Sequence, residues 1–277
     1  MSRNYFAIEN RTNLTKERSR AILPLLVRQA MARQKIKYKD LAEELGLHHR
    51  ALRYPLGCIG DILSEMNEQW PEEIPQIQGL VVNQETGLPG DNVHFLRHRP
   101  DPREKEAIVE EVLGKVFSYS KWLDVLEELG LSPAAPLNLQ FEPPANGRGP
   151  RESEAHKRLK EYVAQHPKSV GLKKSLAPGE TEYRLPSGDI PDVLFQDQNC
   201  RIAVEVKSRI SNQNDLRRGL FQCVKYRALL RACRSLEGGI YEADAILAIE
   251  GSFPKELIPV RNTLGIRVKS VEVKGNN

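Results

Sequence analysis

Two short apolar segments, each carrying an acid, constrain this sequence most. The first, residues 189–195, contains Asp192 directly after a proline, and the second, residues 202–207, carries Glu205 and Lys207. Both segments have the composition of short strands, and the polar stretch between them predicts a hairpin turn. Glu205 and Lys207 are two residues apart on one strand, so they face the same space, which a carboxylate from the adjoining strand also reaches. Two acids beside a lysine suit a hard divalent cation and a phosphate.

These residues resemble the PD-(D/E)xK nuclease superfamily, which includes restriction endonucleases, Holliday-junction resolvases and phage-type exonucleases. Downstream, the amphipathic segment 215–234 holds Gln222 and Tyr226 in the spacing Gln-x-x-x-Tyr, similar to a motif on the helix after the family's catalytic strand. Upstream, residues 152–162 resemble the family's first helix. The resemblance covers roughly residues 151–277 and implies an α/β fold with a restriction-endonuclease-like mixed central sheet flanked by helices.

The family's first helix often contributes another acid, and helical geometry selects between two candidates. At about 100° per residue, one face of this helix gathers most of its apolar residues. That face consists of Ala155, Leu159, Tyr162, Val163 and His166. Glu152 falls within the same arc, whereas Glu154 points toward solvent. We therefore predict Glu152 as the acid, with Glu154 as the alternative.

The resemblance implies metal-dependent hydrolysis of a phosphodiester. Asp192, Glu205 and the carbonyl of Val206 would hold one or two Mg²⁺ ions, and Mn²⁺ would substitute for Mg²⁺. Lys207 would orient the attacking water and stabilise the growing negative charge. The remaining predicted catalytic residues would complete the outer coordination or position lysine and phosphate: Glu152, Gln222 and Tyr226.

Basic residues gather around this acidic pair, although the net charge of the chain is only +4. Residues 201–234 contain nine basic residues and two acids. Such a distribution favours binding of a polyanion. Contacts to a nucleic-acid backbone are predicted for Arg217, Arg218 and Lys225. The alternative interpretation of a basic run is a solvated helix face.

A segment rich in proline, glycine and small residues divides the chain. Residues 132–150 can neither continue a helix nor pair well in a sheet, so they are predicted to be an interdomain linker. With 277 residues, the chain is long enough for two hydrophobic cores. The predicted domains are residues 1–131 and 151–277.

The N-terminal region predicts a mainly helical domain. Residues 15–34 have apolar side chains at helical spacing, and residues 37–45, followed by Gly46 and a basic segment, fit a helix-turn-helix. Arg50 and Arg53 on the second of these helices could reach phosphates or base edges of DNA. A structural or protein-binding role is the alternative.

This region also resembles the winged-helix half of alkyltransferase-like proteins, in residues 38–42, 74–83 and 87–90. The reactive cysteine of that family lies in a Pro-Cys-His-Arg motif, and residues 75–78 here read Pro-Gln-Ile-Gln. The nucleophile is therefore missing, and alkyl transfer is not expected. The resemblance still implies a winged-helix-like domain whose shape suits binding to duplex DNA.

Cysteine usage and hydropathy indicate the compartment. The four cysteines show no paired spacing, which favours free thiols in a reducing cytoplasm. No stretch approaches about 20 apolar residues, so no membrane span is expected. The first residues lack the apolar core of a secretory signal.

These features together predict a Mg²⁺-dependent DNA endonuclease of a restriction or defence type that acts on duplex DNA. Cutting both strands of a duplex usually requires two active sites, so a homodimer is expected. Partner proteins of a defence system would fit the same interpretation. Two alternatives stay open: a catalytically inactive DNA-binding regulator, and a nuclease acting on RNA or on branched DNA.

Overall fold

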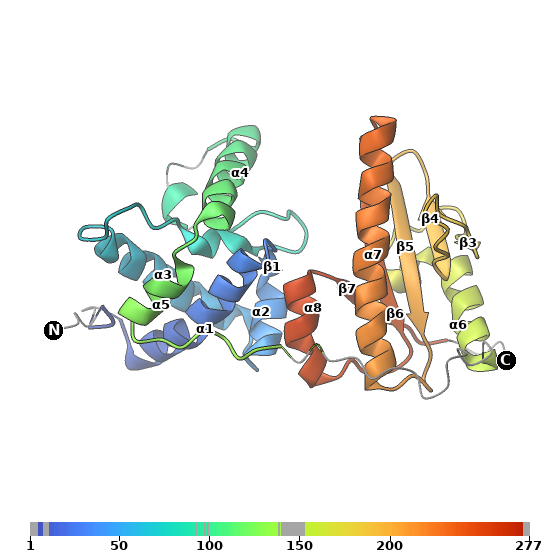
Figure 1. Cartoon of the computed structure of the whole chain (residues 1–277), viewed down its shortest axis with the longest axis horizontal. Coiled ribbons are helices and arrows are strands. Elements are labelled where there is room, and N and C mark those ends of the chain that lie inside the picture. Colours follow the sequence, from blue (N-terminus) through green and yellow to red (C-terminus); the bar gives the residue numbers. More distant parts are fainter. Residues whose placement is uncertain are drawn as a thin grey trace. The chain divides into compact units, whose positions relative to one another are not determined.

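The computed structural model divides the chain into two compact units, residues 1–137 and residues 138–277 (Figure 1). It describes residues 5–7, 11–91, 93–96, 98, 100–137, 139 and 153–273. Most of the predicted linker, residues 132–150, lies outside the described residues. Because each unit has its own core, each is described by itself.

The first unit is mainly helical, as its sequence predicts. Its elements in chain order are α1 (Asn13–Met31), β1 (Ile36–Lys37), α2 (Tyr38–Glu44), η1 (His49–Leu52), α3 (Arg53–Met66), η2 (Ile77–Leu80), β2 (Val81–Val82), η3 (His94–Leu96), α4 (Pro102–Ser118) and α5 (Trp122–Glu128).

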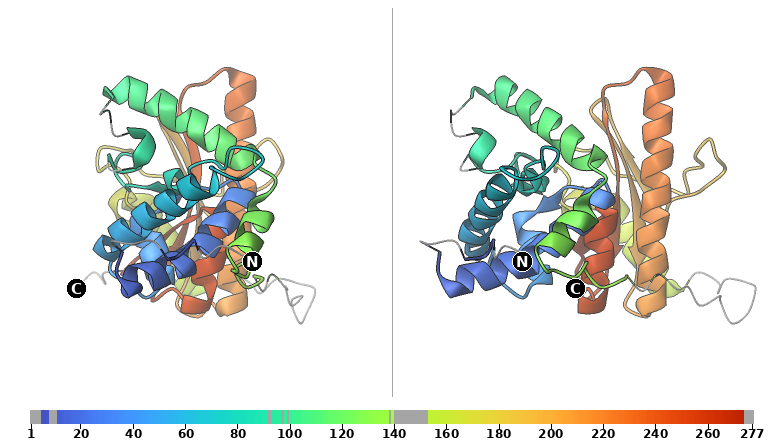
Figure 2. Two further views of the ribbon diagram at one scale, coloured as in Figure 1. Left: turned by 90° about the vertical axis from the view of Figure 1, so that its left-hand side faces the viewer. Right: turned by 60° about the vertical axis from the view of Figure 1, so that its left-hand side comes forward.

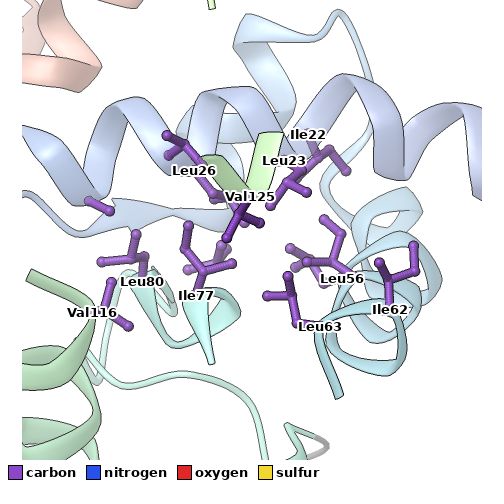
Figure 3. Packing of buried hydrophobic residues seen from close by; sticks show 14 of the residues in the cluster. Ile22, Leu23, Leu26, Leu56, Ile62, Leu63, Ile77, Leu80, Val116 and Val125 are labelled. Carbon is purple, nitrogen blue, oxygen red and sulfur yellow. The ribbon is translucent and has the colours of Figure 1, made fainter. Parts of the chain in front are cut away.

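The core of the first unit forms around α1 because this helix repeats apolar residues every three or four positions. Its Leu23 and Leu26 are fully buried, and they lie among Leu63 of α3, Ile77 of η2 and Val125 of α5 (Figure 3). The side-chain oxygen of the N-cap residue, Thr12, accepts a hydrogen bond from the first turn. The helix ends at residue 31, three residues earlier than predicted.

The segment predicted as a helix-turn-helix forms two helices with a glycine turn between them. Gly46 follows α2 with φ +64°, a conformation that glycine adopts at little cost. The next turn differs from the prediction, because residues 49–52 form the 3₁₀ helix η1 and α3 starts only at Arg53. The ring nitrogen Nδ1 of His48 accepts a hydrogen bond from the backbone N–H of Arg50, so His48 caps this turn.

The segment predicted to form a wing has a compact arrangement of its own. Residues 77–80 form η2, and β2 then pairs in parallel with β1 through Ile36 and Val81. Residues 83–88 turn back on themselves, with the N–H of Asn83 donating to the carbonyl of Leu88.

The second unit is a mixed α/β fold, which confirms the predicted fold class at that level. Its five-stranded sheet has the order β3-β4-β5-β6-β7. The pairs β3–β4 and β4–β5 are antiparallel, and the pairs β5–β6 and β6–β7 are parallel. Its elements are α6 (Glu154–Gln165), η4 (Pro167–Val170), β3 (Glu180–Thr181), β4 (Val193–Gln196), β5 (Cys200–Lys207), α7 (Gln213–Glu237), β6 (Glu242–Ile249), η5 (Lys255–Leu257), α8 (Ile258–Leu264) and β7 (Arg267–Ser270).

Helices cover both faces of this sheet, with α6 and α7 on opposite sides (Figures 1 and 2). On β5, Val204 and Val206 belong to the buried cluster that includes Leu159 of α6. Glu205 and Lys207 point the other way, toward α7, as the period-two alternation of a strand predicts. The alternation of apolar residues along β5 therefore places the acid and the lysine on the face that is covered by α7.

The predicted hairpin is present, but its first strand is shorter than predicted. β4 and β5 pair through Val193 and Val204, and the turn closes with Asp197 accepting backbone hydrogen bonds through its carboxylate. The prediction that the strand begins at residue 189 is wrong, since β4 starts at Val193. Pro191 has no N–H for a ladder, and a loop ends at this proline.

Among the described residues, no helix is both long and apolar enough to cross a membrane.

We expect truncation of a core side chain in the sheet to destabilise the second unit strongly. Phe195 is fully buried in the cluster beneath α6, so Phe195→Ala should lower the free energy of unfolding by about 3–5 kcal/mol. The matched control Ile240→Ala removes a fully exposed side chain and should change it by less than about 0.5 kcal/mol. Urea unfolding followed by circular dichroism measures both, and equal effects would contradict this core assignment.

Candidate functional site

Asp192 and Glu205 lie opposite each other where β4 meets β5. Val193 pairs with Val204, so the antiparallel register places Asp192 beside Glu205 one step further. Asp192 does not continue the ladder through its backbone. Instead its Oδ2 accepts a hydrogen bond from the N–H of Val206 at 2.7 Å. The two carboxylates therefore sit on neighbouring strand ends, with Asp192 fixed to the backbone of β5.

The carbonyl of Val206 points toward the same edge of β5 as Asp192. In a strand, the N–H and C=O of one residue point to the same neighbouring strand. The N–H of Val206 reaches Asp192, while the carbonyl of the following residue, Lys207, accepts from the N–H of Glu250 on the opposite side. The geometry thus leaves the Val206 carbonyl on the side of β5 where the Asp192 carboxylate lies.

Glu205, Lys207 and Gln222 form a connected polar group under α7. The Lys207 ammonium donates to Glu205 Oε1 at 2.6 Å and to Gln222 Oε1 at 3.3 Å. Glu205 is only 4% exposed, so its charge is held largely away from water. A buried carboxylate needs a partner of opposite charge, and Lys207 supplies it.

The environment of Glu205 makes this carboxylate easier to protonate than an exposed one. Burial, reinforced by the negative charge of Asp192, raises the pKa of Glu205 from its ordinary value near 4.5 to about 7, while the Lys207 ammonium opposes this shift. Burial also raises the pKa of the Cys223 thiol, which packs in α7 against Glu205. The Glu205 carboxyl group can therefore exchange a proton near neutral pH, and a bound cation would favour its ionised form.

His156 joins this group, and the sequence interpretation missed it. Its Nε2 lies 3.2 Å from Asp192 Oδ1, so the Asp192 carboxylate contacts a ring nitrogen on one side and the Val206 N–H on the other. His156 stands in the first turn of α6, which begins after the N-cap residue Ser153. The only signal in the sequence was a histidine one turn from the buried residues of an amphipathic helix.

The predicted acid of the first helix, Glu152, lies outside the described residues. The alternative, Glu154, is exposed at the start of α6. The buried face of α6 is rotated about the helix axis relative to the predicted face, because Lys160 is buried and His166 is exposed. With this rotation, His156 lies beside Asp192.

Tyr226 lies one helical turn after Gln222 but contacts a different part of the site. Its hydroxyl donates to the carbonyl of Ile190 at 3.3 Å, and the side chain is buried. Burial raises the pKa of this phenol well above its ordinary value of 10. Tyr226 thus stays a neutral donor that fixes the loop before Asp192, whereas Gln222 contacts Lys207 directly.

A pocket of about 1000 Å³ opens beside Asp192, Lys207 and Gln222, and all the residues that line it belong to the second unit. Its walls come from α6, from the loop before β4, from the end of β5 and from α7. The side chains that line it and enter the argument are His156, Lys160, Asp192, Lys207, Arg218, Gln222 and Lys225. Cations and carboxylates therefore share one cavity.

Most of the basic residues in the predicted cluster have structural partners. Arg227 donates to the carbonyls of Leu264 and Gly265 at the end of α8, and Arg231 and Arg234 donate to backbone carbonyls before and within β6. Arg227 is buried, and such contacts satisfy carbonyls that would otherwise lack a donor. Counting basic residues along the sequence therefore overestimates how many of them are available to bind a polyanion.

The three predicted backbone-contact residues differ in their surroundings. Arg217 is buried and donates to Asn214, so little of its side chain is accessible, and its contact to a nucleic-acid backbone stays a prediction. Arg218 lines the pocket and lies 3.4 Å from Asp215 one turn earlier. Lys225 also lines the pocket, with its ammonium 2.6 Å from Asp189.

In the first unit, the predicted DNA contacts Arg50 and Arg53 are both exposed, on η1 and at the start of α3. The guanidinium of Arg53 lies 5.9 Å from the ring centroid of Tyr54, itself an exposed aromatic residue.

The donor set around Asp192 has the chemistry of a two-carboxylate metal site. Within the described residues, no three side chains of His, Cys, Asp or Glu gather as a metal-binding cluster. Mg²⁺ commonly takes only one or two carboxylates from the protein, with water and substrate phosphate completing its shell. Asp192, Glu205 and the Val206 carbonyl are oxygen donors on adjoining strand ends, so the residues present fit such an ion.

In comparisons with protein families, with curated proteins and with solved structures, nothing matched this chain.

The raised pKa of Glu205 should make stability depend on pH between about 4.5 and 7. The folded protein holds this proton more tightly than the unfolded chain, so the stabilisation is complete below pH 4.5 and is lost as pH rises through 7. The glutamine of the Glu205→Gln variant cannot ionise, so its stability lacks this dependence on pH. Between pH 5 and pH 8 without metal, the free energy of unfolding of the wild type should therefore fall by on the order of 2–3 kcal/mol relative to that of Glu205→Gln. Urea unfolding at both pH values tests this, and parallel pH profiles would contradict it.

Gly219 of α7 should be required for the approach of this helix to Lys207. A Cβ at this position would lie 2.7 Å from Leu247 Cδ1 and 3.1 Å from Lys207 Cε. We expect Gly219→Ala to lower the free energy of unfolding by about 1–3 kcal/mol. The control is Gly114→Ala in α4, where no atom lies within 4 Å and a gain of about 0.5–1 kcal/mol is expected. A gain in both variants, measured by urea unfolding, would show that α7 packs less closely.

Proposed function

We propose that this protein is a Mg²⁺-dependent DNA nuclease of the PD-(D/E)xK kind, with the site in the second unit. In this proposal the mixed sheet is a restriction-endonuclease-like core, and the first unit is a winged-helix-like DNA-binding domain. A restriction or defence role, action as a homodimer, and partner proteins of a defence system belong to the same proposal. The four free cysteines suit a reducing cytoplasm.

One observation carries the proposal: Asp192 and Glu205 occupy opposing positions on two strands, with Lys207 bonded to Glu205. The acid and lysine share a strand face, and the second acid comes from the neighbouring strand. Gln222 on α7 then contacts the same lysine. Asp192, Lys207 and Gln222 line one polar pocket, and Glu205 is bonded to Lys207 beneath it, an arrangement that a solvated surface ion pair would not require.

The chain's own residues would divide the work as follows. Asp192, Glu205 and the Val206 carbonyl would hold the cation, which when bound supplies positive charge to the scissile phosphate. Lys207 would hold a phosphate oxygen or orient the attacking water. Gln222 would keep the lysine ammonium in place.

His156 is the further residue that the geometry adds to this group. Its ring nitrogen contacts Asp192 at 3.2 Å, so it orients that carboxylate and is itself within reach of a cation held there. Imidazole suits Mn²⁺ better than Mg²⁺ as a ligand, because nitrogen is the softer donor. This supports the substitution of Mg²⁺ by Mn²⁺ in the proposed site.

The first unit is proposed to contact duplex DNA through the region of η1 and α3. Arg50 and Arg53 are exposed there, and exposed arginines near a helix start can reach phosphates or base edges. The chain also offers Arg218 and Lys225 beside the pocket of the second unit. Phosphate contacts of this kind position a strand without reading its sequence.

Removal of Asp192 or Lys207 should abolish cleavage while DNA binding persists. Purified protein is incubated with supercoiled plasmid, linear duplex, single-stranded DNA and RNA, each with Mg²⁺, Mn²⁺ or EDTA. We expect metal-dependent cutting of DNA by the wild type, and a loss of at least about 10³-fold in Asp192→Ala and Lys207→Ala. Gel shifts in EDTA measure binding for each protein.

Lys255→Ala is the matched control, because this lysine is exposed on η5 and does not line the pocket. It should cut at the wild-type rate. Wild-type cutting by either site variant would refute the assignment. Binding that persists without any metal-dependent cutting would favour an inactive DNA-binding regulator, and selective cutting of RNA would favour the alternative substrate.

A further inference from the structure

Two exposed isoleucines stand at the wall of the pocket, where charged side chains would be expected. Ile190 is 45% exposed and Ile210 is 65% exposed, and both line the cavity that holds Asp192 and Lys207. Each lies close to a site residue along the chain: Ile190 comes two residues before Asp192, and Ile210 comes three after Lys207. Single exposed apolar residues are common on proteins, but two at one polar pocket call for an explanation.

Ile210 is presented by a turn whose backbone is held in place. The N–H of Ser211 donates to the carbonyl of Ser208, which closes the turn, and the N–H of Arg209 donates to Glu250 at 3.1 Å. Immediately afterwards, Asn212 and Asp215 form a capping box at the start of α7. The tip of this turn therefore carries a branched apolar side chain on a fixed backbone, at a position where polar residues are usual.

Ile190 is fixed in a comparable way on the other loop. Its carbonyl accepts the buried Tyr226 hydroxyl, and the carboxylate of the preceding residue, Asp189, contacts Lys225. The next residue, Pro191, restricts the backbone of Ile190 as well. Both isoleucines thus stay exposed although their backbones are held by hydrogen bonds or by the ring of a proline.

We infer that Ile190 and Ile210 contact the faces of unpaired bases, and that the substrate is DNA with a single-stranded segment at the cleavage point. This inference rests on the proposed nuclease function and narrows its substrate class to tailed, splayed or branched DNA. The contacted nucleotide would place its phosphate among Lys160, Lys207, Arg218 and Lys225, all of which line the same pocket.

The physical reason is the surface that each form of DNA offers. An intact duplex presents phosphates along its outside and keeps its base faces stacked, so an isoleucine beside the backbone meets little apolar surface. An unpaired strand exposes its base faces, and an apolar side chain that covers such a face removes apolar surface from water. A fixed backbone lowers the entropy lost when the strand binds.

The test compares binding without metal, so that cleavage does not interfere. Fluorescence anisotropy in EDTA and 0.1 M salt measures the affinity for a closed dumbbell duplex, for a duplex with a single-stranded tail, and for a single strand of equal length. The wild type should bind the tailed probe about tenfold more tightly than the dumbbell, and it should bind the single strand more tightly than the Ile190→Ala/Ile210→Ala protein does. Ile190→Ala/Ile210→Ala should lose this preference and keep its affinity for the dumbbell.

The control is Leu236→Ala/Ile240→Ala, which removes two strongly exposed apolar residues of the same unit that do not line the pocket. It should bind all three probes as the wild type does. A second measurement places 2-aminopurine at the junction of the tailed probe: its fluorescence should change with the wild type and the control but not with the Ile190→Ala/Ile210→Ala protein.

The inference fails if the wild type binds all three probes equally or none of them, or if the isoleucine variant weakens every probe alike. These outcomes are separate from the failure of the proposed function, which shows as an absence of metal-dependent cutting on every substrate. Because both side chains are exposed and outside the core, the variant should fold, and an unchanged thermal midpoint checks this. The single variant Ile210→Ser provides an independent test with the same expected direction.

Discussion

The ion pair between Glu205 and Lys207 is the constraint around which the second unit is arranged. A carboxylate that is almost fully buried is costly to keep charged, and its lysine partner at 2.6 Å offsets part of that cost. The lysine in turn is held by Gln222, and Gly219 allows α7 to come close enough for that contact. The helix, the strand and the polar group therefore depend on one another, and a change at any of them would reach the others.

The same arrangement explains why Asp192 lies outside the ladder. Its carboxylate accepts the Val206 N–H that a longer β4 would have bonded through its backbone. The end of the strand is thus converted into a fixed carboxylate beside Glu205. The repulsion between these two acids contributes to the raised pKa of Glu205, and it makes this corner of the sheet favourable for a cation.

Much of the second unit could be predicted because its signals are local. The alternation of β5, the hairpin turn and the long amphipathic segment gave the faces and order of these elements, and the structure contains them. The predicted start of β4 was too early, because Pro191 has no N–H to donate and the strand pairs with β5 only from Val193 onward. In the first unit, the glycine turn after α2 was predicted, but the 3₁₀ turn of residues 49–52 was not. That turn is capped by the ring of His48, a contact that no apolar pattern signals.

The sequence by itself determined which residues share a strand face or a helix turn: Glu205 with Lys207, and Gln222 with Tyr226. These relations are fixed by the geometry of a single element. Only the tertiary structure decided that His156 meets Asp192, that Tyr226 fixes the loop at Ile190, and that Arg227 serves a carbonyl of α8. Each of these pairs is separated by more than thirty residues, so it depends on the rotation and packing of whole elements, which no local pattern specifies.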